Sequence, residues 1–210
     1  EWVVDLRQRR AFARHHAPGT ISVEMGDSFA TFLGWAMPWG RPLSLIGESA
    51  TQVAAAQREL ARIGVEQLTG AAIASTGSAP TGSTGSAATG STDGTARSAS
   101  QGLGARSASA YRVAGFEDLA PVLGQPGVVV VDVRRRDEWD AGHVSGAVHI
   151  PFWEIEDRVE EIPPGEVWAY CATGLRASIS ASLIERSGRR PVLIDDDWPP
   201  AAGTGLPIVR

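Results

Sequence analysis

The single cysteine of this 210-residue chain, Cys171, stands between an apolar run and a helical pattern. The run before it, "EVWAY" (166–170), is typical of a buried strand, and "GLRASISASLIERSG" (174–188) is typical of a helix. In open parallel α/β sheets, ligands bind where the carboxyl end of a strand leads into a helix. A free cysteine has a pKa of about 8.5, and a helix N-terminus lowers it and favours the thiolate. The position therefore predicts a cysteine nucleophile.

The loop after the cysteine is short and contains one glycine. Its backbone N–H groups are expected to converge on one spot, where the helix dipole adds partial positive charge. They would bind substrate and stabilise a thiolate or a terminal persulfide anion. Gly174 is expected to adopt a positive φ, and Arg176 to brace loop carbonyls or add positive charge. The predicted backbone cradle consists of Ala172, Thr173, Gly174 and Leu175. The competing interpretation makes Cys171 a small buried apolar residue.

The residues that must position this loop alternate between strand and helix patterns. The predicted strands are "GVVVVDV" (127–133), "GAVHIP" (146–151), "GEVWAYC" (165–171) and "RPVLIDDD" (190–197). Between them, "RDEWDAG" (136–142) and "PFWEIEDRVEEI" (151–162) have helical spacing. This alternation predicts an α/β fold with a parallel sheet flanked by helices.

The first part of the chain repeats the second. Residues 3–23 align without a gap on 130–150 at an offset of 127, and residues 43–64 align on 167–188 at an offset of 124. Asp5 matches Asp132 and Arg7 matches Arg134, whereas Gly47 takes the place of Cys171. The chain is therefore interpreted as two copies of one domain, the first without a nucleophile.

Three segments follow from this repeat. We expect a first domain at 1–70 and a second domain at 110–210. Between them, residues 71–109 are almost entirely Ala, Gly, Ser and Thr. Such a composition cannot bury enough apolar surface to fold, so it predicts a flexible linker.

Several other features exclude or favour functions. The net charge of −5 argues against a nucleic-acid-binding protein, and no apolar run is long enough to span a membrane. One cysteine cannot form an intramolecular disulfide, which favours the cytoplasm.

His15 and His16 are expected to be surface or turn residues, and no metal or cofactor is expected. Trp35 and Trp39 are expected either to form an exposed patch that contacts a further domain or to pack in the core. The chain begins "EWVVDL" and is expected to be a fragment of a longer protein.

At the cysteine the sequence resembles the rhodanese family of sulfurtransferases. "CATGLR" resembles the C-x-x-G-x-R loop of that family, and "VVDVR", "GHVSGAVHIP" and the closing "DDDWPPAAGTGLP" resemble its other signatures. The resemblance covers about residues 111–208. It implies a rhodanese fold and transfer of a sulfane sulfur through a Cys171 persulfide, from thiosulfate or a low-molecular-weight persulfide to a thiol or cyanide. Asp132 and Arg134 are expected to support the loop.

The first copy resembles a degenerate rhodanese module. With its segment 26–43 it is similar to the part that follows a metallo-β-lactamase-fold persulfide dioxygenase in bacterial fusion proteins. That resemblance implies a dioxygenase domain as a partner outside this sequence. Two departures bear on the donor: Ala172 replaces a basic residue, and Asp196 and Asp197 replace a glycine pair. Both disfavour a dianion such as thiosulfate.

Two other functions stay open. A noncatalytic binding or regulatory module would suit the first copy, which lacks a thiol. A phosphatase or arsenate reductase would need a wider C-x5-R loop, whereas Cys171 and Arg176 are in C-x4-R spacing.

Overall fold

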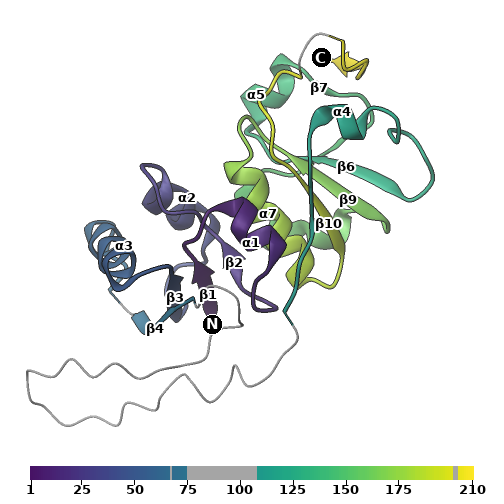
Figure 1. Cartoon of the computed structure of the whole chain (residues 1–210). Coiled ribbons are helices and arrows are strands. Elements are labelled where there is room, and N and C mark those ends of the chain that lie inside the picture. The colour runs from purple at the N-terminus through teal and green to yellow at the C-terminus, as the bar shows by residue number, and fades with distance from the viewer. Residues whose placement is uncertain (67, 75–107, 201–202) are drawn as a thin grey trace, which may run out of the picture.

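The computed structural model describes residues 1–66, 68–74, 108–200 and 203–210. These residues form two lobes, each built on its own sheet of parallel strands (Figure 1). The N-terminal lobe has four strands in the order β2-β1-β3-β4. Its elements are β1 (Trp2–Asp5), α1 (Arg9–Arg14), β2 (Ile21–Ser22), α2 (Phe29–Ala36), β3 (Leu43–Gly47), α3 (Ala50–Arg62) and β4 (Leu68–Ile73).

The C-terminal lobe has five parallel strands in the order β5-β10-β9-β6-β8, and β7 pairs with β11 in a separate antiparallel ribbon. Its first elements are β5 (Arg112–Ala114), α4 (Phe116–Leu119), β6 (Val128–Asp132), α5 (Arg136–Ala141), β7 (His143–Val144) and β8 (Val148–His149). They are followed by η2 (Phe152–Glu154), α6 (Ile155–Arg158), η3 (Val159–Glu161), β9 (Glu166–Tyr170), α7 (Leu175–Arg186), β10 (Arg190–Ile194) and β11 (Ile208–Val209). The predicted α/β fold with parallel sheets and flanking helices is confirmed.

The boundaries predicted for the linker are wrong at both ends. Residues 71–73 belong to β4, where they pair with β3. In this edge strand, half-buried residues alternate with exposed ones. The strand therefore has little surface to bury and can form from small side chains. At the other end, the backbone of Ser109 exchanges two hydrogen bonds with that of His16. The rest of the predicted linker, 75–107, lies outside the described residues.

Helix α7 lies between the two lobes (Figure 1). It packs on β9 and β10 of its own sheet and on β2 of the N-terminal lobe. Every residue from Ala177 to Ile184 is buried. The hydroxyl groups of Ser178, Ser180 and Ser182 donate hydrogen bonds to backbone carbonyls of the same helix. Small side chains with satisfied hydroxyls let both lobes approach the helix closely, which accounts for the "ASISAS" sequence.

His16 is not the surface residue that the sequence predicts. Its side chain is buried and stacks on Phe12, with 3.9 Å between ring centroids. Its Nε2 lies 2.6 Å from Oε2 of Glu185, near the end of α7, and Ser109 donates to the other carboxylate oxygen of Glu185. His15, by contrast, is exposed, as expected. The difference arises because the second lobe covers one face of α1.

The repeat predicted from the sequence is reproduced in the hydrogen bonds. Arg7 binds the Asp5 carboxylate and donates to the carbonyl of His15. Arg134 makes the same bonds to Asp132 and to the carbonyl of Gly142. The two sets of residues differ by the same 127 positions as the sequence alignment. The lobes therefore share local geometry as well as strand patterns.

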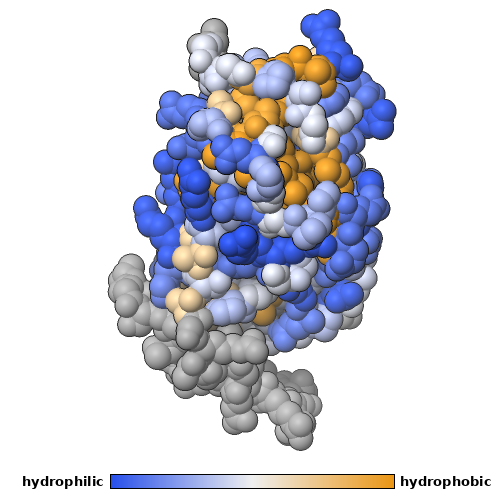
Figure 2. Space-filling model, turned by 90° about the vertical axis from the view of Figure 1, so that its right-hand side faces the viewer, coloured by the Kyte–Doolittle hydropathy of each residue, from blue (hydrophilic) through white to orange (hydrophobic). Residues whose placement is uncertain are grey.

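The two faces of the C-terminal sheet have different surroundings. Val131, Val167 and Ala169 join a core that also includes residues of the N-terminal lobe. Trp168 and Tyr170 point to the opposite face, where a smaller cluster is covered in part by half-buried apolar residues. Figure 2 shows apolar side chains gathered on the side of the molecule that the C-terminal lobe occupies. The site described next lies toward the first face, between the lobes.

Candidate active site

Cys171 follows β9 directly, at the carboxyl end of a central strand. Its side chain is buried, with 1% of the residue exposed, and belongs to the core shared by both lobes. Adjacent strand β10 pairs Leu193 with Ala169, so Asp195 leaves the sheet in register with Cys171. The register therefore places Cys171 and Asp195 at the same edge of the sheet, at the ends of adjacent strands.

The loop after Cys171 has unengaged backbone donors. Among the residues that the structure describes, no protein group accepts a hydrogen bond from the N–H groups of residues 172–176. Gly174 is the N-cap of α7 and supplies no side-chain cap. These donors and the start of a 12-residue helix suit an anion. The cradle residues predicted from the sequence, Ala172 to Leu175, thus lie together as one turn.

Gly174 adopts φ +85°, as expected for the turn. A side chain there would be strained and would also overlap the carboxylate of Asp195 and approach Nε of Arg9 to 3.1 Å. This glycine is therefore needed for two reasons, its backbone conformation and the close approach of Asp195.

Arg176 binds a carboxylate instead of bracing loop carbonyls. Its Nη1 and Nη2 donate to Glu138 of α5 at 2.6 and 2.9 Å. Burial lowers the pKa of Arg176, but its interactions with Glu138 and with Cys171 outweigh burial and raise it. The hydrogen bond from Arg176 in turn lowers the pKa of Glu138. A charged guanidinium is thereby held close to the thiol.

Sequence reasoning missed Glu138 as a site residue. Its carboxylate also accepts from the backbone N–H of Arg135, three residues earlier, at the start of α5. An acidic residue at the third position of a helix is a recognisable capping signal. That signal predicts a capping role, but only the folded chain shows that Glu138 faces Arg176.

Asp132 and Arg134 form a buried pair beneath the loop. The Arg134 Nε donates to both carboxylate oxygens of Asp132 at 3.0 Å. The guanidinium lies 4.1 Å from the centroid of the Trp198 ring, and Trp198 donates its backbone N–H to the carbonyl of Ala172. This chain of contacts joins the pair to the loop, and its role as structural support stays a prediction.

The N-terminal lobe reaches the same loop through α1. The Arg9 guanidinium donates through Nε to Asp195 at 2.5 Å and through Nη1 to Glu24 at 2.7 Å. Its Nη2 lies 3.4 Å from the carbonyl oxygen of Thr173. Arg10 also binds the Asp195 carboxylate, whose side chain is 3% exposed. The residue near the loop is therefore Asp195, neutralised by two arginines. Asp196 lies elsewhere and accepts from the backbone N–H of Phe116.

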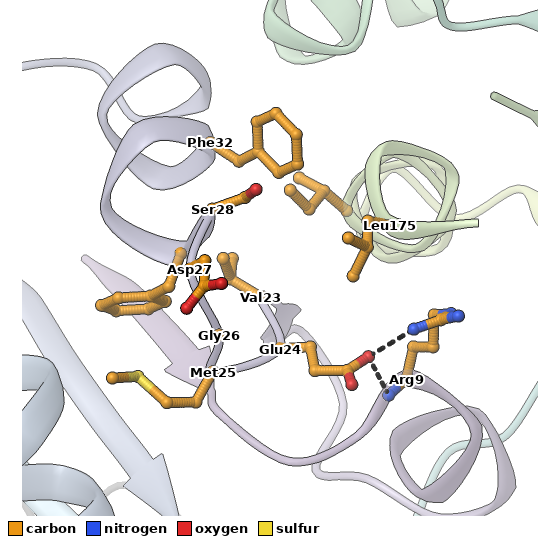
Figure 3. A pocket seen from close by; sticks show the side chains of 11 residues that line it. Arg9, Val23, Glu24, Met25, Gly26, Asp27, Ser28, Phe32 and Leu175 are labelled. Atoms are coloured by element: carbon orange, nitrogen blue, oxygen red, sulfur yellow. Dashed lines mark hydrogen bonds and ion pairs between the residues drawn. The ribbon is translucent and has the colours of Figure 1, made fainter. Parts of the chain in front are cut away.

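Two adjoining pockets lie along the seam between the lobes. One, of about 310 Å³, is lined by Arg9, Glu24 and Ser28 of the N-terminal lobe and by Leu175 and Ile179 of the C-terminal lobe (Figure 3). The second, of about 400 Å³, shares Ser28, Phe32 and Leu175 with the first and adds Trp35, Arg135, Glu138, Thr173 and Arg176. Both open beside the loop, so a ligand in either would contact both lobes.

Trp35 is 51% exposed and Trp39 is 63% exposed, which agrees with an exposed patch and not with core packing. They differ in their surroundings. Trp35 packs edge-on against Trp153 of the C-terminal lobe, with 5.7 Å between ring centroids, and it lines the second pocket. Trp39 lines neither pocket.

The equivalent loop of the N-terminal lobe is closed by its own side chains. Ser49 caps α3 by accepting from the N–H of Gln52. The Gln52 side chain in turn accepts from the N–H of Glu48 at 2.7 Å. A Cβ added at Gly47 would lie 2.7 Å from Val53 and 3.1 Å from the Gln52 side-chain oxygen. There is neither a thiol nor an open cradle in the described part of this lobe.

Two further findings concern metal sites and membrane spans in the described residues. Over the ranges that the structure covers, no three His, Cys, Asp or Glu side chains gather where they could hold a metal ion. Within the same ranges, each helix is too short or too polar to traverse a bilayer.

Comparisons with known proteins agree on the C-terminal lobe. Residues 116–199 match the family model "Rhodanese-like domain", so the chain contains such a domain. "Putative sulfur carrier protein YrkF" of Bacillus subtilis is 32% identical over 65 residues, 30% of this chain and 35% of that protein. "HTH-type transcriptional regulator Rv0324" of Mycobacterium tuberculosis is 34% identical over 84 residues, 39% of this chain and 37% of its own length.

The similar region thus spans little more than a third of each of these relatives. Among solved structures, a rhodanese-like domain protein from Staphylococcus aureus aligns with 24% identity and a TM-score of 0.42. The alignment covers 47% of this chain and 99% of that one.

Proposed function

We propose that the rhodanese-like domain of this chain is a sulfurtransferase that carries a sulfane sulfur as a persulfide on Cys171. The strongest support comes from the loop that follows Cys171. Its five backbone N–H groups, of residues 172–176, donate to no protein acceptor among the described residues. Such donors stabilise an anion at the place where a persulfide would project. The similarity to a protein named as a sulfur carrier agrees with the proposal.

In the first step, the Cys171 thiolate attacks the outer sulfur of a donor. A bond forms between Cys171 Sγ and that sulfur while the donor's S–S bond breaks. The electron pair leaves with sulfite when the donor is thiosulfate, or with an organic thiolate when it is a persulfide. Arg176, held by Glu138, stabilises the negative charge on the attacking and the product sulfur.

In the second step, an acceptor thiolate or cyanide attacks the outer sulfur of the Cys171 persulfide. The electron pair of the broken bond returns to Cys171 Sγ, which restores the thiolate. The two steps together transfer one sulfur atom without net oxidation or reduction of the protein. The pockets beside Thr173 and Leu175 provide the approach for donor and acceptor.

The N-terminal lobe is, in this proposal, a degenerate copy of the same domain. Its repeated Asp5–Arg7 pair and its closed Gln52 loop support a duplication followed by loss of the nucleophile. Exposed Trp39 would contact a further domain, such as a metallo-β-lactamase-fold dioxygenase, in a longer parent protein.

A noncatalytic regulatory module is the second candidate. It is favoured by the nearly complete burial of Cys171 and by the similarity to a protein named as a transcriptional regulator. In this case the loop would bind an anion without transferring sulfur.

Steady-state transfer separates the two candidates. The assay measures transfer to cyanide from thiosulfate and, separately, from a low-molecular-weight persulfide, with the wild-type protein and Cys171→Ser. Transfer that Cys171→Ser abolishes, with unchanged thermal unfolding, supports the sulfurtransferase. Equal transfer by both proteins would refute it.

A further inference from the structure

One cation that contacts the Cys171 loop, Arg9, comes from the lobe that has no thiol. Arg9 is the first residue of α1, and its guanidinium contacts three acceptors that belong to both lobes. Asp195 and Thr173 lie on the C-terminal side of the seam and Glu24 on the N-terminal side. Figure 3 shows Arg9 bound to Glu24 at the wall of the pocket, below Leu175 in this view.

The contacts of Arg9 differ from those of a substrate-binding cation. All three of its side-chain nitrogens face protein oxygens, and only 25% of its side chain is exposed. Its strongest partner, Asp195, lies against Gly174 and in strand register with Cys171. Arg9 is therefore placed to fix the loop and to neutralise a carboxylate that lies against Gly174, at the end of the strand next to that of Cys171.

We propose that Arg9 is a positioning residue for Cys171, through which the thiol-free lobe controls the reactivity of the other lobe's thiol. The inference rests on the proposed function only in assigning sulfur transfer as the reaction. With Arg9 in place, the Asp195 charge is paired and Gly174 is held at its positive φ. Without Arg9, the Asp195 carboxylate keeps only the exposed Arg10 as a partner, and it would then repel a thiolate or persulfide anion on Cys171 at the end of the adjacent strand.

Arg10 does not replace Arg9 in this role. It shares the Asp195 carboxylate, but its side chain is 65% exposed, so solvent screens its charge. Its only other hydrogen bond in the described part of the chain goes to the backbone of Asp195. Arg14, an exposed residue of the same helix, offers a matched control because it allows the same substitution away from the loop.

The test compares Arg9→Gln with Arg14→Gln by two readouts. The first is the rate at which iodoacetamide alkylates Cys171 as a function of pH, which requires no sulfur transfer. The second is the rate of sulfur loading from a persulfide donor. We expect Arg9→Gln to slow both by about tenfold near neutral pH and to shift the alkylation profile to higher pH. Arg14→Gln should leave both unchanged.

A double-mutant cycle with Asp195→Asn shows whether Arg9 acts through Asp195. In the Asp195→Asn background, adding Arg9→Gln should change the alkylation rate by no more than about twofold, because the charge that Arg9 neutralises is gone. An undiminished tenfold effect in that background, or wild-type rates for Arg9→Gln alone, would overturn the inference. If wild-type protein is alkylated but never loaded with sulfur, the proposed function fails while the alkylation cycle still decides the role of Arg9.

Discussion

Replacing Gly174 with alanine tests whether the loop and the seam between the lobes are one structural unit. Gly174 and Gly188 both adopt φ +85°, at opposite ends of α7. An added Cβ at Gly188 meets nothing within 4 Å, whereas at Gly174 it overlaps Asp195. Gly188→Ala is thus a control with the same backbone cost and without the steric conflict.

The expected magnitudes follow from these surroundings. A left-handed conformation costs a residue with a Cβ about 1 kcal/mol more than glycine, so Gly188→Ala should lower the free energy of unfolding by about that much. Gly174→Ala must also displace Asp195 from Arg9 and Arg10. Breaking a buried pair costs about 3–5 kcal/mol. Because Arg9 is 25% exposed and Arg10 is 65% exposed, we reduce this contribution to about 2 kcal/mol, for a total of about 3 kcal/mol.

Urea unfolding and sulfur loading of both variants provide the measurements. Gly188→Ala should load sulfur on Cys171 at the wild-type rate, and Gly174→Ala at least about tenfold more slowly, since the loop donors move with the glycine. Equal losses of stability in the two variants would refute the reasoning that Asp195 packs against the loop.

Three further predictions concern the pair at Arg176, the pocket wall and the seam. Glu138→Gln should lower kcat/KM for sulfur transfer by about tenfold, because Arg176 loses its bidentate carboxylate. The control Glu161→Gln breaks an exposed pair with Arg158 and should leave kcat/KM unchanged. Trp35→Ala should raise the KM for an organic persulfide by about fivefold through lost pocket contact, and a similar increase for Trp39→Ala would contradict the assignment. Burial raises the pKa of Glu185, but hydrogen bonds from His16 and Ser109 outweigh burial and hold it below 4.5. The lowered pKa stabilises the fold above pH 4.5, and that contribution is lost as the pH falls through the folded-state pKa. Chemical unfolding at several acidic pH values should therefore show a steeper loss of stability for wild type than for Glu185→Gln.

Local sequence patterns predicted the elements that carry the candidate site. The apolar run before Cys171 forms β9, the helix after Gly174 forms α7, and Gly174 has the expected positive φ. These features depend on periodicity and on glycine conformations, which a short window of sequence contains. The constant offset between the two halves likewise anticipated the equivalent Asp–Arg pairs.

Contacts between distant residues could not be predicted in this way. Arg9 and Asp195 are 186 positions apart, and each resembles an ordinary surface charge in the sequence. The same holds for His16, which becomes buried only because Glu185 of α7 meets α1. Strand β5 has three residues and lies at the edge of its sheet, so it leaves little apolar signal. The packing of one lobe on the other decides the contacts of Arg9 and His16.

Intact-protein mass spectrometry tests the central proposal, a persulfide on Cys171, most directly. The protein is incubated with thiosulfate or, separately, with a low-molecular-weight persulfide, and one portion is then reduced with dithiothreitol. We expect a gain equal to the mass of one sulfur atom, confined to the Cys171 peptide and reversed by the reductant. No gain from either donor, with the loop intact and the protein folded, would contradict it and favour the regulatory module.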